Sequence, residues 1–386
     1  MKAYEIKKNI YWVGGVDWNV RNFHGYSTQR GTTYNAYLII DDKNTLIDTV
    51  KRNLTHELIQ RVSDIIDPSS IDYLISNHVE MDHSGSIPQI MNYAQNATII
   101  TSLQGEKGLK AYYNDFYTYR AVQSGEQLSL GTRKIQFVHT PMVHWPDNMV
   151  SFCPEEKVLF SNDAFGQHIA SSQRFDSEYP LDIILLEAKK YYANIVLPYS
   201  NQVRKALETV SKLDVEIIAP SHGIVWKNHL NVILQNYTQW SSNLFDKKAV
   251  IIYDTMWNST ETMAYAIQDV FEEKGYTTSL CNLKMNHISD IMTDVLSAAY
   301  ICVGSPTLNK QIMPNVASFL TYLHGLAPKN RKAVAFGSYG WNNMSLKYIE
   351  KYFKDAGVET IGSYGVKYLP TIDNLNEIKE DLKSKI

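Results

Sequence analysis

Residues 77–85 read NHVEMDHSG and directly follow the apolar run YLIS at residues 73–76. The run predicts a short buried strand and the Ser-Gly pair predicts a break, so the polar segment lies at a strand-to-loop edge. Within it, two adjacent potential metal ligands, Asp82 and His83, cannot both point one way from a regular strand. A loop can splay them, and ligands that point apart suit two metals better than one. The alternative is a polar loop with two surface histidines, which we disfavour because the segment offers four potential ligands so close together: His78, Glu80, Asp82 and His83.

Three further potential ligands stand at turns after strand-like runs later in the chain. His144 lies in TPMVHWP, Asp163 follows the run KVLF at residues 157–160, and His222 follows VEIIAPS at residues 215–221. Such turns bring side chains that are distant in sequence to one edge of a sheet. These three residues are therefore candidates to complete the metal site.

The order H-x-E-x-D-H at residues 78–83 resembles the H-x-H-x-D-H signature of the metallo-β-lactamase superfamily, whose usual members bind two zinc ions. Glu80 at the second position is the mark of the flavodiiron proteins (A-type flavoproteins), which the chain resembles along nearly its whole length. Zinc sites favour nitrogen and sulfur ligands, whereas an oxygen-rich set suits iron or manganese. The resemblance implies one iron held by His78, Glu80 and His144, a second held by Asp82, His83 and His222, and Asp163 as a bridge.

The composition indicates a two-domain protein, since 386 residues exceed one average domain and 44% of them are hydrophobic. Lysine and arginine number 37 against 40 acidic residues, with no block of like charge, which argues against nucleic acid or an anionic membrane as a partner. No apolar run approaches the roughly 20 residues that span a bilayer, and the N-terminus has no apolar signal core, so we expect a cytoplasmic protein. The isolated cysteines Cys153, Cys281 and Cys302 argue against a disulfide scaffold, an iron–sulfur cluster or a fused rubredoxin module.

The first part of the chain is rich in predicted strands, with helices between them. We expect a strand over residues 9–16, a hairpin over 35–50 and a helix over 55–66 with Thr55 as its cap. This α/β order, which continues to about residue 235, suits an αββα sandwich. That is the fold that the resemblance implies for a metallo-β-lactamase-like domain over residues 1–246.

The pattern changes near residues 240–248. The unbroken apolar run AVIIY at residues 249–253 is typical of a parallel strand covered on both faces, and strands recur at 299–303 and 332–336. The alternation with helical stretches predicts a doubly wound parallel sheet, a flavodoxin-like domain over residues 247–386.

Each of these three strands ends in a polar loop. The first, residues 254–260, precedes a helix expected to open at Glu261, and its hydroxyls with the helix N–H groups form a phosphate site without lysine or arginine. It resembles the flavodoxin phosphate loop, although Asn258 or Ser259 stands where that family often has glycine. The loops at 304–309 and 337–342 resemble those that bracket a flavin ring, with Tyr339 and Trp341 as stacking candidates. The predicted FMN contacts are Thr255, Met256, Trp257, Asn258, Ser259, Thr260, Ser305, Pro306, Thr307, Leu308, Asn309, Ser338, Tyr339, Gly340 and Trp341. The fingerprint G-x-G-x-x-G is absent, so NAD is not expected.

The resemblance implies an oxidoreductase in which FMN passes electrons to a diiron centre that reduces dioxygen to water or nitric oxide to nitrous oxide. His24 and His168 resemble family positions close to the irons that are not ligands. The family keeps a pocket tyrosine where Tyr191 and Tyr192 stand, and the sequence leaves both open.

Two other functions are compatible with parts of the sequence. One is a dizinc hydrolase with an appended flavodoxin domain, which Glu80 argues against; the other is a diiron gas sensor or electron carrier, for which no output module is present. For the reductase, the resemblance implies rubredoxin or a reduced deazaflavin as electron donor. It also implies a head-to-tail homodimer or a dimer of dimers, while the preference between the two gases stays open.

Overall fold

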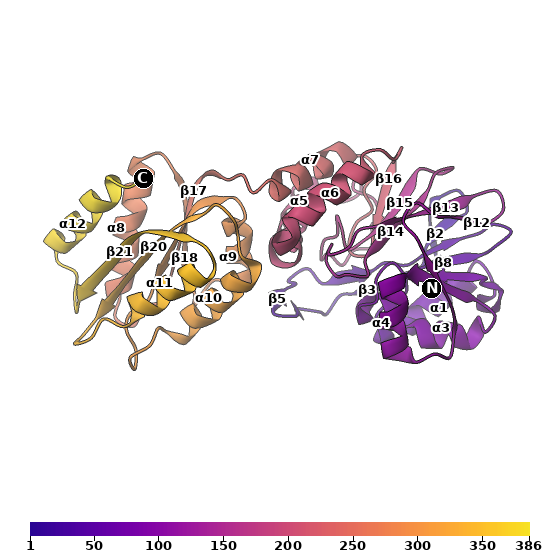
Figure 1. Cartoon of the computed structure of the whole chain (residues 1–386), viewed down its shortest axis with the longest axis horizontal. Helices are drawn as coiled ribbons and strands as arrows, with labels where there is room; N and C mark the ends of the chain where they lie inside the picture. Colours follow the sequence, from indigo (N-terminus) through magenta and orange to yellow (C-terminus); the bar gives the residue numbers. More distant parts are fainter. The chain divides into compact units, whose positions relative to one another are not determined.

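The computed structural model describes residues 1–386, which fold into two compact units (Figure 1). The first unit comprises Met1–His24, Thr28–Tyr191 and Asn201–Thr238, and the second comprises Gly25–Ser27, Tyr192–Ser200 and Gln239–Ile386. The domain boundary between residues 246 and 247 stays a prediction. No helix combines the length and the apolar character that crossing a membrane requires.

The first unit is built on two main sheets. A seven-stranded sheet has the order β1-β2-β7-β8-β9-β10-β11, a five-stranded sheet has the order β12-β13-β14-β15-β16, and β3 pairs with β6 and β4 with β5. Their bounds are β1 (Tyr4–Lys7), β2 (Ile10–Trp12), β3 (Gly15–Asp17), β4 (Asn22–Phe23), β5 (Tyr26–Ser27), β6 (Thr32–Tyr34), β7 (Tyr37–Ile39), β8 (Thr45–Ile47), β9 (Tyr73–Ile75), β10 (Thr98–Ser102), β11 (Thr118–Val122), β12 (Gln127–Ser129), β13 (Lys134–His139), β14 (Met149–Cys153), β15 (Val158–Asn162) and β16 (Ile217–Pro220).

Alternating apolar side chains hold the two sheets together. Ile39, Ile47 and Ile75 of the seven-stranded sheet share a buried cluster with Phe137 and Phe160 of the five-stranded sheet. Burying such a side chain stabilises the fold by roughly 1.5–3 kcal/mol relative to leaving it exposed. The residues that precede these isoleucines point to the opposite face, as strand periodicity requires, and join a second cluster beneath the helices: Leu38, Leu46 and Leu74.

Helices cover both outer faces, which makes the unit the αββα sandwich that the sequence predicted. Apolar residues of α1 (Thr55–Ser63), α3 (Ile87–Tyr93) and α4 (Leu103–Tyr113) pack on the seven-stranded sheet. The helices α5 (Leu181–Tyr191), α6 (Ser200–Val210) and α7 (Leu230–Ser241) lie over the five-stranded sheet (Figure 1).

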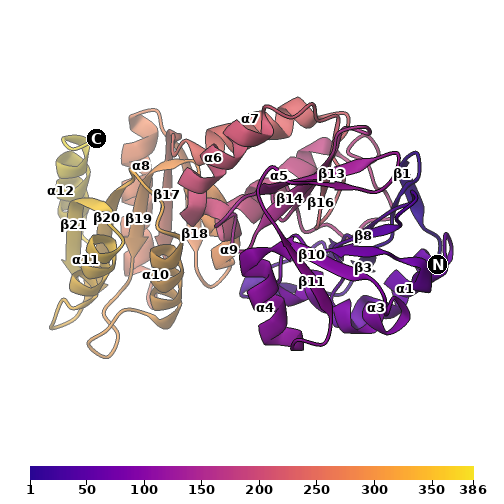
Figure 2. The same ribbon diagram turned by 45° about the vertical axis from the view of Figure 1, so that its right-hand side comes forward.

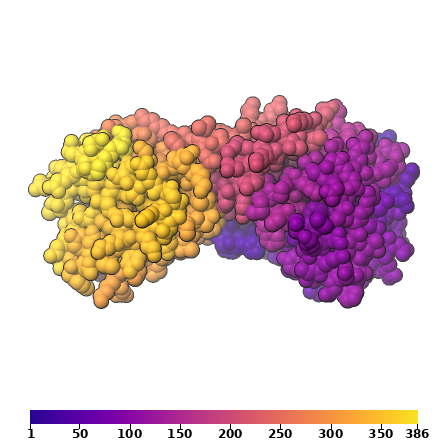
Figure 3. All heavy atoms as spheres, viewed as in Figure 1, coloured from indigo at the N-terminus to yellow at the C-terminus, as the bar shows by residue number.

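The second unit is a doubly wound parallel sheet in the order β18-β17-β19-β20-β21, as predicted. Helices α8 and α12 cover one face and α9, α10 and α11 lie on the other (Figure 2), and the C-terminal residues, yellow in Figure 3, lie on the surface of this unit. The bounds are β17 (Asp246–Tyr253), α8 (Ser259–Glu273), β18 (Thr277–Asn282), α9 (Ile288–Val295), β19 (Ala298–Gly304), α10 (Pro314–Leu326), β20 (Lys332–Tyr339), α11 (Ser345–Asp355), β21 (Glu359–Lys367) and α12 (Ile372–Lys383).

Several predicted boundaries were wrong. The strand expected over residues 9–16 divides into β2, which pairs with β7, and β3, which pairs with β6 in a separate sheet. Between them, a side chain at Gly14 would lie 2.2 Å from the carbonyl oxygen of Tyr34, so only glycine fits there. Thr55 is not a cap: Leu54 occupies that position, and the Thr55 hydroxyl donates to the carbonyl of Arg52 at 2.7 Å. Helix α8 begins at Ser259, two residues earlier than expected.

Candidate metal centre and flavin loops

The segment that follows β9 is partly helical rather than a loop. Met81–Ser84 form the short helix α2, in which the Ser84 N–H donates to the carbonyl of Glu80 at 2.9 Å. Successive residues in a helix are rotated by about 100°, so Asp82 and His83 point in different directions. The prediction of a loop was wrong, while the divergence of these two side chains is present.

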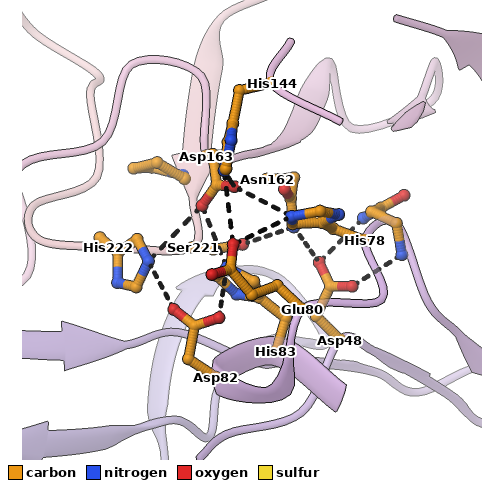
Figure 4. Close-up of polar contacts among 12 residues, drawn as sticks. Asp48, His78, Glu80, Asp82, His83, His144, Asn162, Asp163, Ser221 and His222 are labelled. Carbon is orange, nitrogen blue, oxygen red and sulfur yellow. Dashed lines mark hydrogen bonds and ion pairs between the residues drawn. The ribbon is translucent and has the colours of Figure 1, made fainter. Parts of the chain in front are cut away.

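The other candidate ligands follow different strands. Asp163 comes directly after β15, His222 follows β16, and His144 lies in the turn between β13 and β14. Figure 4 shows these side chains converging with those of the α2 segment. The fold therefore brings together all seven residues that the sequence singled out, and they form two groups of potential metal ligands.

The first group contains His78, Glu80, His144 and Asp163, with its ligand atoms within 4.8 Å of one another. Nε2 of His78 and Nε2 of His144 each lie 3.4 Å from Oε2 of Glu80. Nε2 of His144 also lies 3.2 Å from Oδ2 of Asp163. Two imidazoles and two carboxylates thus face one small volume.

The second group contains Asp82, His83 and His222. Nε2 of His83 lies 3.3 Å from Oδ1 of Asp82, and Nε2 of His222 lies 3.2 Å from Oδ2 of the same carboxylate. Oδ1 of Asp163 lies 3.0 Å from Nε2 of His83. Because its other oxygen faces His144, the Asp163 carboxylate spans the two groups (Figure 4).

The donor atoms fit bound metal ions better than a network of protein hydrogen bonds. Both carboxylate oxygens of Asp82 and Asp163 and Nε2 of His83 are buried and have no hydrogen-bond partner. Nearly all buried polar groups in proteins have a hydrogen-bond partner, and each one left without a partner destabilises the fold by about 1–3 kcal/mol. Cations that accept these lone pairs account for the arrangement, and the three carboxylates make the set richer in oxygen than a typical zinc site.

The electrostatics of the centre favour positive charge. Burial alone lowers the pKa of His78, but hydrogen bonds with Asp147 and Glu80 and the charge of Asp163 raise it to about 10. Nearby carboxylates likewise outweigh burial and raise the pKa of His144 to about 10 and that of His83 to about 9. The histidines in turn hold the pKa of Glu80 and Asp163 below the ordinary range, against the effect of burial. A field that favours a proton on imidazole also favours a metal cation between the carboxylates.

Two outer contacts fix the orientation of ligand histidines, and the sequence did not reveal them. Nδ1 of His78 lies 2.8 Å from Oδ2 of Asp147, and Nδ1 of His222 lies 2.8 Å from the carbonyl oxygen of Thr33. With Nδ1 as the donor, Nε2 keeps its lone pair for the centre. In the sequence, Asp147 could have been noticed as a carboxylate that stands three residues after the candidate ligand His144.

A buried amide network supports the strand ends beside the centre, and its members Asp48, Asn162 and Ser221 are labelled in Figure 4. Asp48 accepts hydrogen bonds from the backbone and side chain of Asn77 at 2.7 and 3.0 Å. Asn162, beside Asp163, donates to Oγ of Ser221 at 3.1 Å, next to His222. Nδ2 of Asn162 also lies 3.5 Å from Oδ2 of Asp48, so these contacts tie the turns that carry three of the ligands to one another.

The predicted neighbours of the centre occupy distinct places. Nε2 of His24 lies 3.3 Å from Oε1 of Glu80. His168 lies beside His222, with ring centroids 5.0 Å apart, and burial lowers its pKa, as does the nearby His222. The Tyr191 ring lies 5.9 Å from that of His222, whereas the hydroxyl of Tyr192 contacts Oγ of Ser200 at 3.0 Å. The geometry therefore puts Tyr191 beside the centre and turns Tyr192 away from it.

A cavity of about 470 Å³ leads to the centre, and Glu80 and Asp82 lie in its wall. His24, Lys51, Tyr112 and Trp145 also line it. Lys51, Tyr112 and Trp145 were not predicted from the sequence to lie at the site. The centre is therefore accessible to small molecules through a mouth that polar and apolar side chains line together.

The three predicted flavin loops meet at the carboxyl ends of β17, β19 and β20. Oγ1 of Thr260 lies 3.3 Å from Oγ of Ser338, and the Thr307 N–H donates to the carbonyl of Ser338 at 2.9 Å. Ser338 and Tyr339 belong to β20 rather than to a loop. Convergence of three loops at this edge is the usual position of a ligand in a doubly wound sheet.

Several groups in these loops are suited to a bound flavin phosphate. Asn258 adopts a left-handed conformation (φ 63°) and makes no side-chain cap, which leaves the N–H groups at the start of α8 free of that contact. Oγ1 of Thr255 is buried without a hydrogen-bond partner. Trp257 and Trp341 are 85% and 89% exposed, an unusual state for large aromatic side chains that a stacked ring would relieve.

Comparison with known proteins gives matches over both units. Residues 32–223 match the ODP family beta lactamase and residues 251–383 match flavodoxin. The chain is 44% identical to a nitric oxide reductase from Moorella thermoacetica, over 97% of this chain and 96% of that protein. The structure of a rubredoxin oxygen:oxidoreductase from Desulfovibrio gigas aligns with a TM-score of 0.97 at 40% identity, over 100% and 98% of the two chains. A flavodiiron protein from Giardia intestinalis aligns with a TM-score of 0.96 at 33% identity, over 100% and 96%.

Proposed function

The chain belongs to the flavodiiron protein family, and we propose that it is a reductase of dioxygen, nitric oxide or both, with FMN in the second unit and two iron ions in the first. The observation that carries this proposal is the position of Asp163, whose two oxygens face different histidines within a set of seven convergent ligands. A carboxylate in that position suits a bridge between two cations.

The proposed ligand sets follow the two groups. His78, Glu80 and His144 would hold one iron, Asp82, His83 and His222 the other, and Asp163 would contact both. Two ferrous ions and reduced FMN together supply four electrons, the number that converts dioxygen into two waters, whereas reduction of two nitric oxide molecules to nitrous oxide needs two. The protein supplies fixed donor atoms, since the outer contacts of His78 and His222 hold both rings in place.

Side chains at the mouth are suited to proton supply and to orienting a bound gas. His24 is largely exposed and lies 3.3 Å from Glu80, so it can exchange protons with solvent and present one near the first group. Tyr191 and His168 are buried beside His222 and suit positioning rather than exchange with bulk water. We assign the pocket tyrosine to Tyr191 and no role in the centre to Tyr192.

In the second unit, we propose that the FMN phosphate binds at Thr255, Ser259 and Thr260, where backbone N–H groups and hydroxyls meet at the start of α8. The remaining predicted contacts would surround the ring, with Tyr339 and Trp341 as stacking partners. The exposure of Trp341 supports its part in this assignment.

Two alternatives are less well supported. A dizinc hydrolase would not need Glu80 in place of the usual histidine, and a sensor would not need a flavin unit. Two relatives that align over nearly the whole chain are named nitric oxide reductase and rubredoxin oxygen:oxidoreductase, which supports catalysis.

The electron donor and assembly complete the proposal. A separate rubredoxin is the donor that the name of the D. gigas relative supports, and a reduced deazaflavin is a second candidate. We propose a head-to-tail homodimer or a dimer of dimers as the working unit. A reducing, cytoplasmic location is supported by three buried cysteines that form no disulfide.

Paired gas-electrode assays test the function most simply. The holoprotein should consume dioxygen, nitric oxide or both over many turnovers with the same reduced rubredoxin. His83→Ala should lose at least about 99% of this activity, as removal of a ligand from a metal-dependent reaction predicts. His139→Ala is the matched control, because His139 lies outside the centre with Nε2 3.1 Å from the carbonyl of Val122. Consumption of neither gas by the iron- and FMN-loaded protein would refute the function.

A further inference from the structure

A second cavity, with a volume of about 20 Å³, lies in the first unit between α6 and the five-stranded sheet. Its walls include Val143, Ala164, Phe165, Val203, Ala206 and Leu207. Thr140 and Tyr237 also line it, but the Tyr237 hydroxyl is occupied, since it accepts the Phe165 N–H at 2.6 Å. The cavity is therefore almost entirely apolar.

This cavity lies directly behind two of the proposed metal ligands. Val143 precedes His144, and Ala164 follows Asp163. The ligand side chains face the metal centre while their neighbours line the cavity. In Figure 4, His144 and Asp163 approach the centre from the side opposite to Asp82, which lines the larger cavity. The centre thus has the larger cavity, with its mixed polar and apolar walls, next to Asp82 and a small apolar space behind His144 and Asp163.

The size and polarity of the cavity determine what it can hold. A water molecule needs about 10–15 Å³ of such space and two to four polar partners, and apolar cavities that lack those partners stay dry. The volume admits one small molecule, but the walls offer almost no hydrogen bonds. An uncharged diatomic gas fits both conditions, because it forms no strong hydrogen bonds and gains dispersion contacts with the walls.

The wall next to Asp163 is held rigidly. Phe165 has φ of 68°, a left-handed conformation that a bulky side chain rarely adopts. Its carbonyl accepts hydrogen bonds from Nε1 of Trp226 at 2.9 Å and Nε2 of Gln167 at 3.1 Å, and its ring packs on Tyr237 with centroids 4.4 Å apart. Several contacts thus maintain a conformation that would otherwise be unfavourable, as is common beside functional sites.

The opposite wall reaches toward solvent. Along α6, Val203 is buried, whereas Ala206 and Leu207 are only half-buried. These two residues are therefore the lining residues of α6 that solvent partly reaches. A bulky side chain at Ala206 would fill the cavity from that side.

We propose that this cavity is a dry binding site for the gaseous substrate, dioxygen or nitric oxide, on a route from α6 to the metal centre. The inference rests on the proposed function for the identity of the gas. The binding of an apolar atom in the cavity is independent of that function.

Xenon is the probe for the site. A crystal of the holoprotein pressurised with xenon should show one xenon atom in contact with Val143, Ala164 and Phe165. Ala206→Phe should remove this xenon and raise the KM for the consumed gas about fivefold or more, while kcat changes less than about twofold. Lys205→Phe is the matched control, because Lys205 is the exposed neighbour on the same helix, and it should leave xenon binding and KM unchanged. Leu207→Trp provides a second filling variant if Ala206→Phe does not fold.

Three outcomes would overturn the inference. They are absence of xenon from the wild-type cavity, an unchanged KM for the gases in a filling variant that has lost xenon, and an equal rise in KM in Lys205→Phe. Iron and FMN content must match the wild type in every variant compared. If the wild-type protein consumes neither gas but xenon binds, the proposed function fails and the gas route fails with it, whereas the apolar site stands. If gas is consumed but xenon does not bind, only the cavity inference fails.

Discussion

Nδ1 of His78 lies 2.8 Å from Oδ2 of Asp147, inside the first unit. The same oxygen accepts the backbone N–H of Val79 at 2.8 Å, so the carboxylate is fixed from two directions. This contact turns Nε2 of His78 toward Glu80 and Asp163. The contact with Asp147 also makes Nε2 of His78 a stronger electron-pair donor to a metal cation.

Asp147→Asn should weaken iron binding about 10- to 100-fold, because the amide keeps the shape of the carboxylate but removes its charge. Competition with a chelator, followed by iron analysis, measures the effect. Asp115→Asn is the control, since Asp115 is an exposed partner of Lys110. Equal iron retention in both variants would show that Asp147 does not support the ligand.

Asn35 clamps the turn that carries His222. Its Nδ2 donates to the carbonyls of Pro220 at 2.8 Å and Gly223 at 3.0 Å, and its Oδ1 accepts Nε1–H of Trp12 at 2.7 Å. Asn35→Ala removes all three hydrogen bonds and leaves the buried Trp12 N–H unpaired, so it should lower the unfolding free energy of the first unit by about 2–4 kcal/mol. Urea unfolding of the metal-free protein measures this loss. The exposed Asn19→Ala should change it by less than about 0.5 kcal/mol, and a similarly small change in Asn35→Ala would contradict the clamp.

Asp41 links the turns of the two sheets and should make stability depend on pH. Its carboxylate accepts the Thr132 N–H at 3.0 Å and the Arg133 N–H at 2.9 Å. Although burial alone raises its pKa, these bonds and one from Asp42 lower the pKa of Asp41 below the ordinary value. A lowered pKa in the folded state means that the stabilisation is present above the unfolded pKa, near 3.9, and is lost as the pH falls through the folded value.

Asp41→Asn should therefore cost about 1–2 kcal/mol of unfolding free energy at pH 7 and progressively less below about pH 4. Urea unfolding across this pH range, with Asp115→Asn as control, checks the prediction. A stability difference that stays constant from pH 7 to the acid limit would contradict the account of Asp41.

Mixed dimers test the proposed head-to-tail assembly. Chains with His83→Ala lack an intact iron site, and chains with Ser259→Ala and Thr260→Ala should bind FMN weakly, so each alone should be nearly inactive. If electrons pass between chains, a mixed dimer keeps the flavin of the first chain opposite the iron site of the second, and activity returns. Confirmed mixing without recovery would exclude transfer between chains.

The sequence was sufficient for the fold class and for the set of candidate ligands, because both depend on local patterns. Alternating apolar residues such as Leu38 and Ile39 determine which face of a strand is buried. Potential metal ligands directly after strands, such as Asp163, can be recognised from the residue type and its position.

What the sequence did not reveal depends on contacts between distant segments. The pairing of His78 with Asp147 and that of Trp12 with Asn35 follow from register and packing, which no local pattern specifies. The choice between Tyr191 and Tyr192 required the course of the chain after α5. The cavity behind Asp163 likewise exists only once α6 packs on the sheet.

The central claim is that an oxygen-rich set of seven side chains holds two iron ions, and metal content tests it most directly. We predict that protein produced with both iron and zinc available contains two irons and little zinc per chain. Glu80→His, which replaces an oxygen ligand by nitrogen, should shift the site toward zinc and abolish gas reduction. His139→Ala should keep the wild-type metal content. Two zinc ions per wild-type chain, or two irons and normal turnover in Glu80→His, would contradict the account.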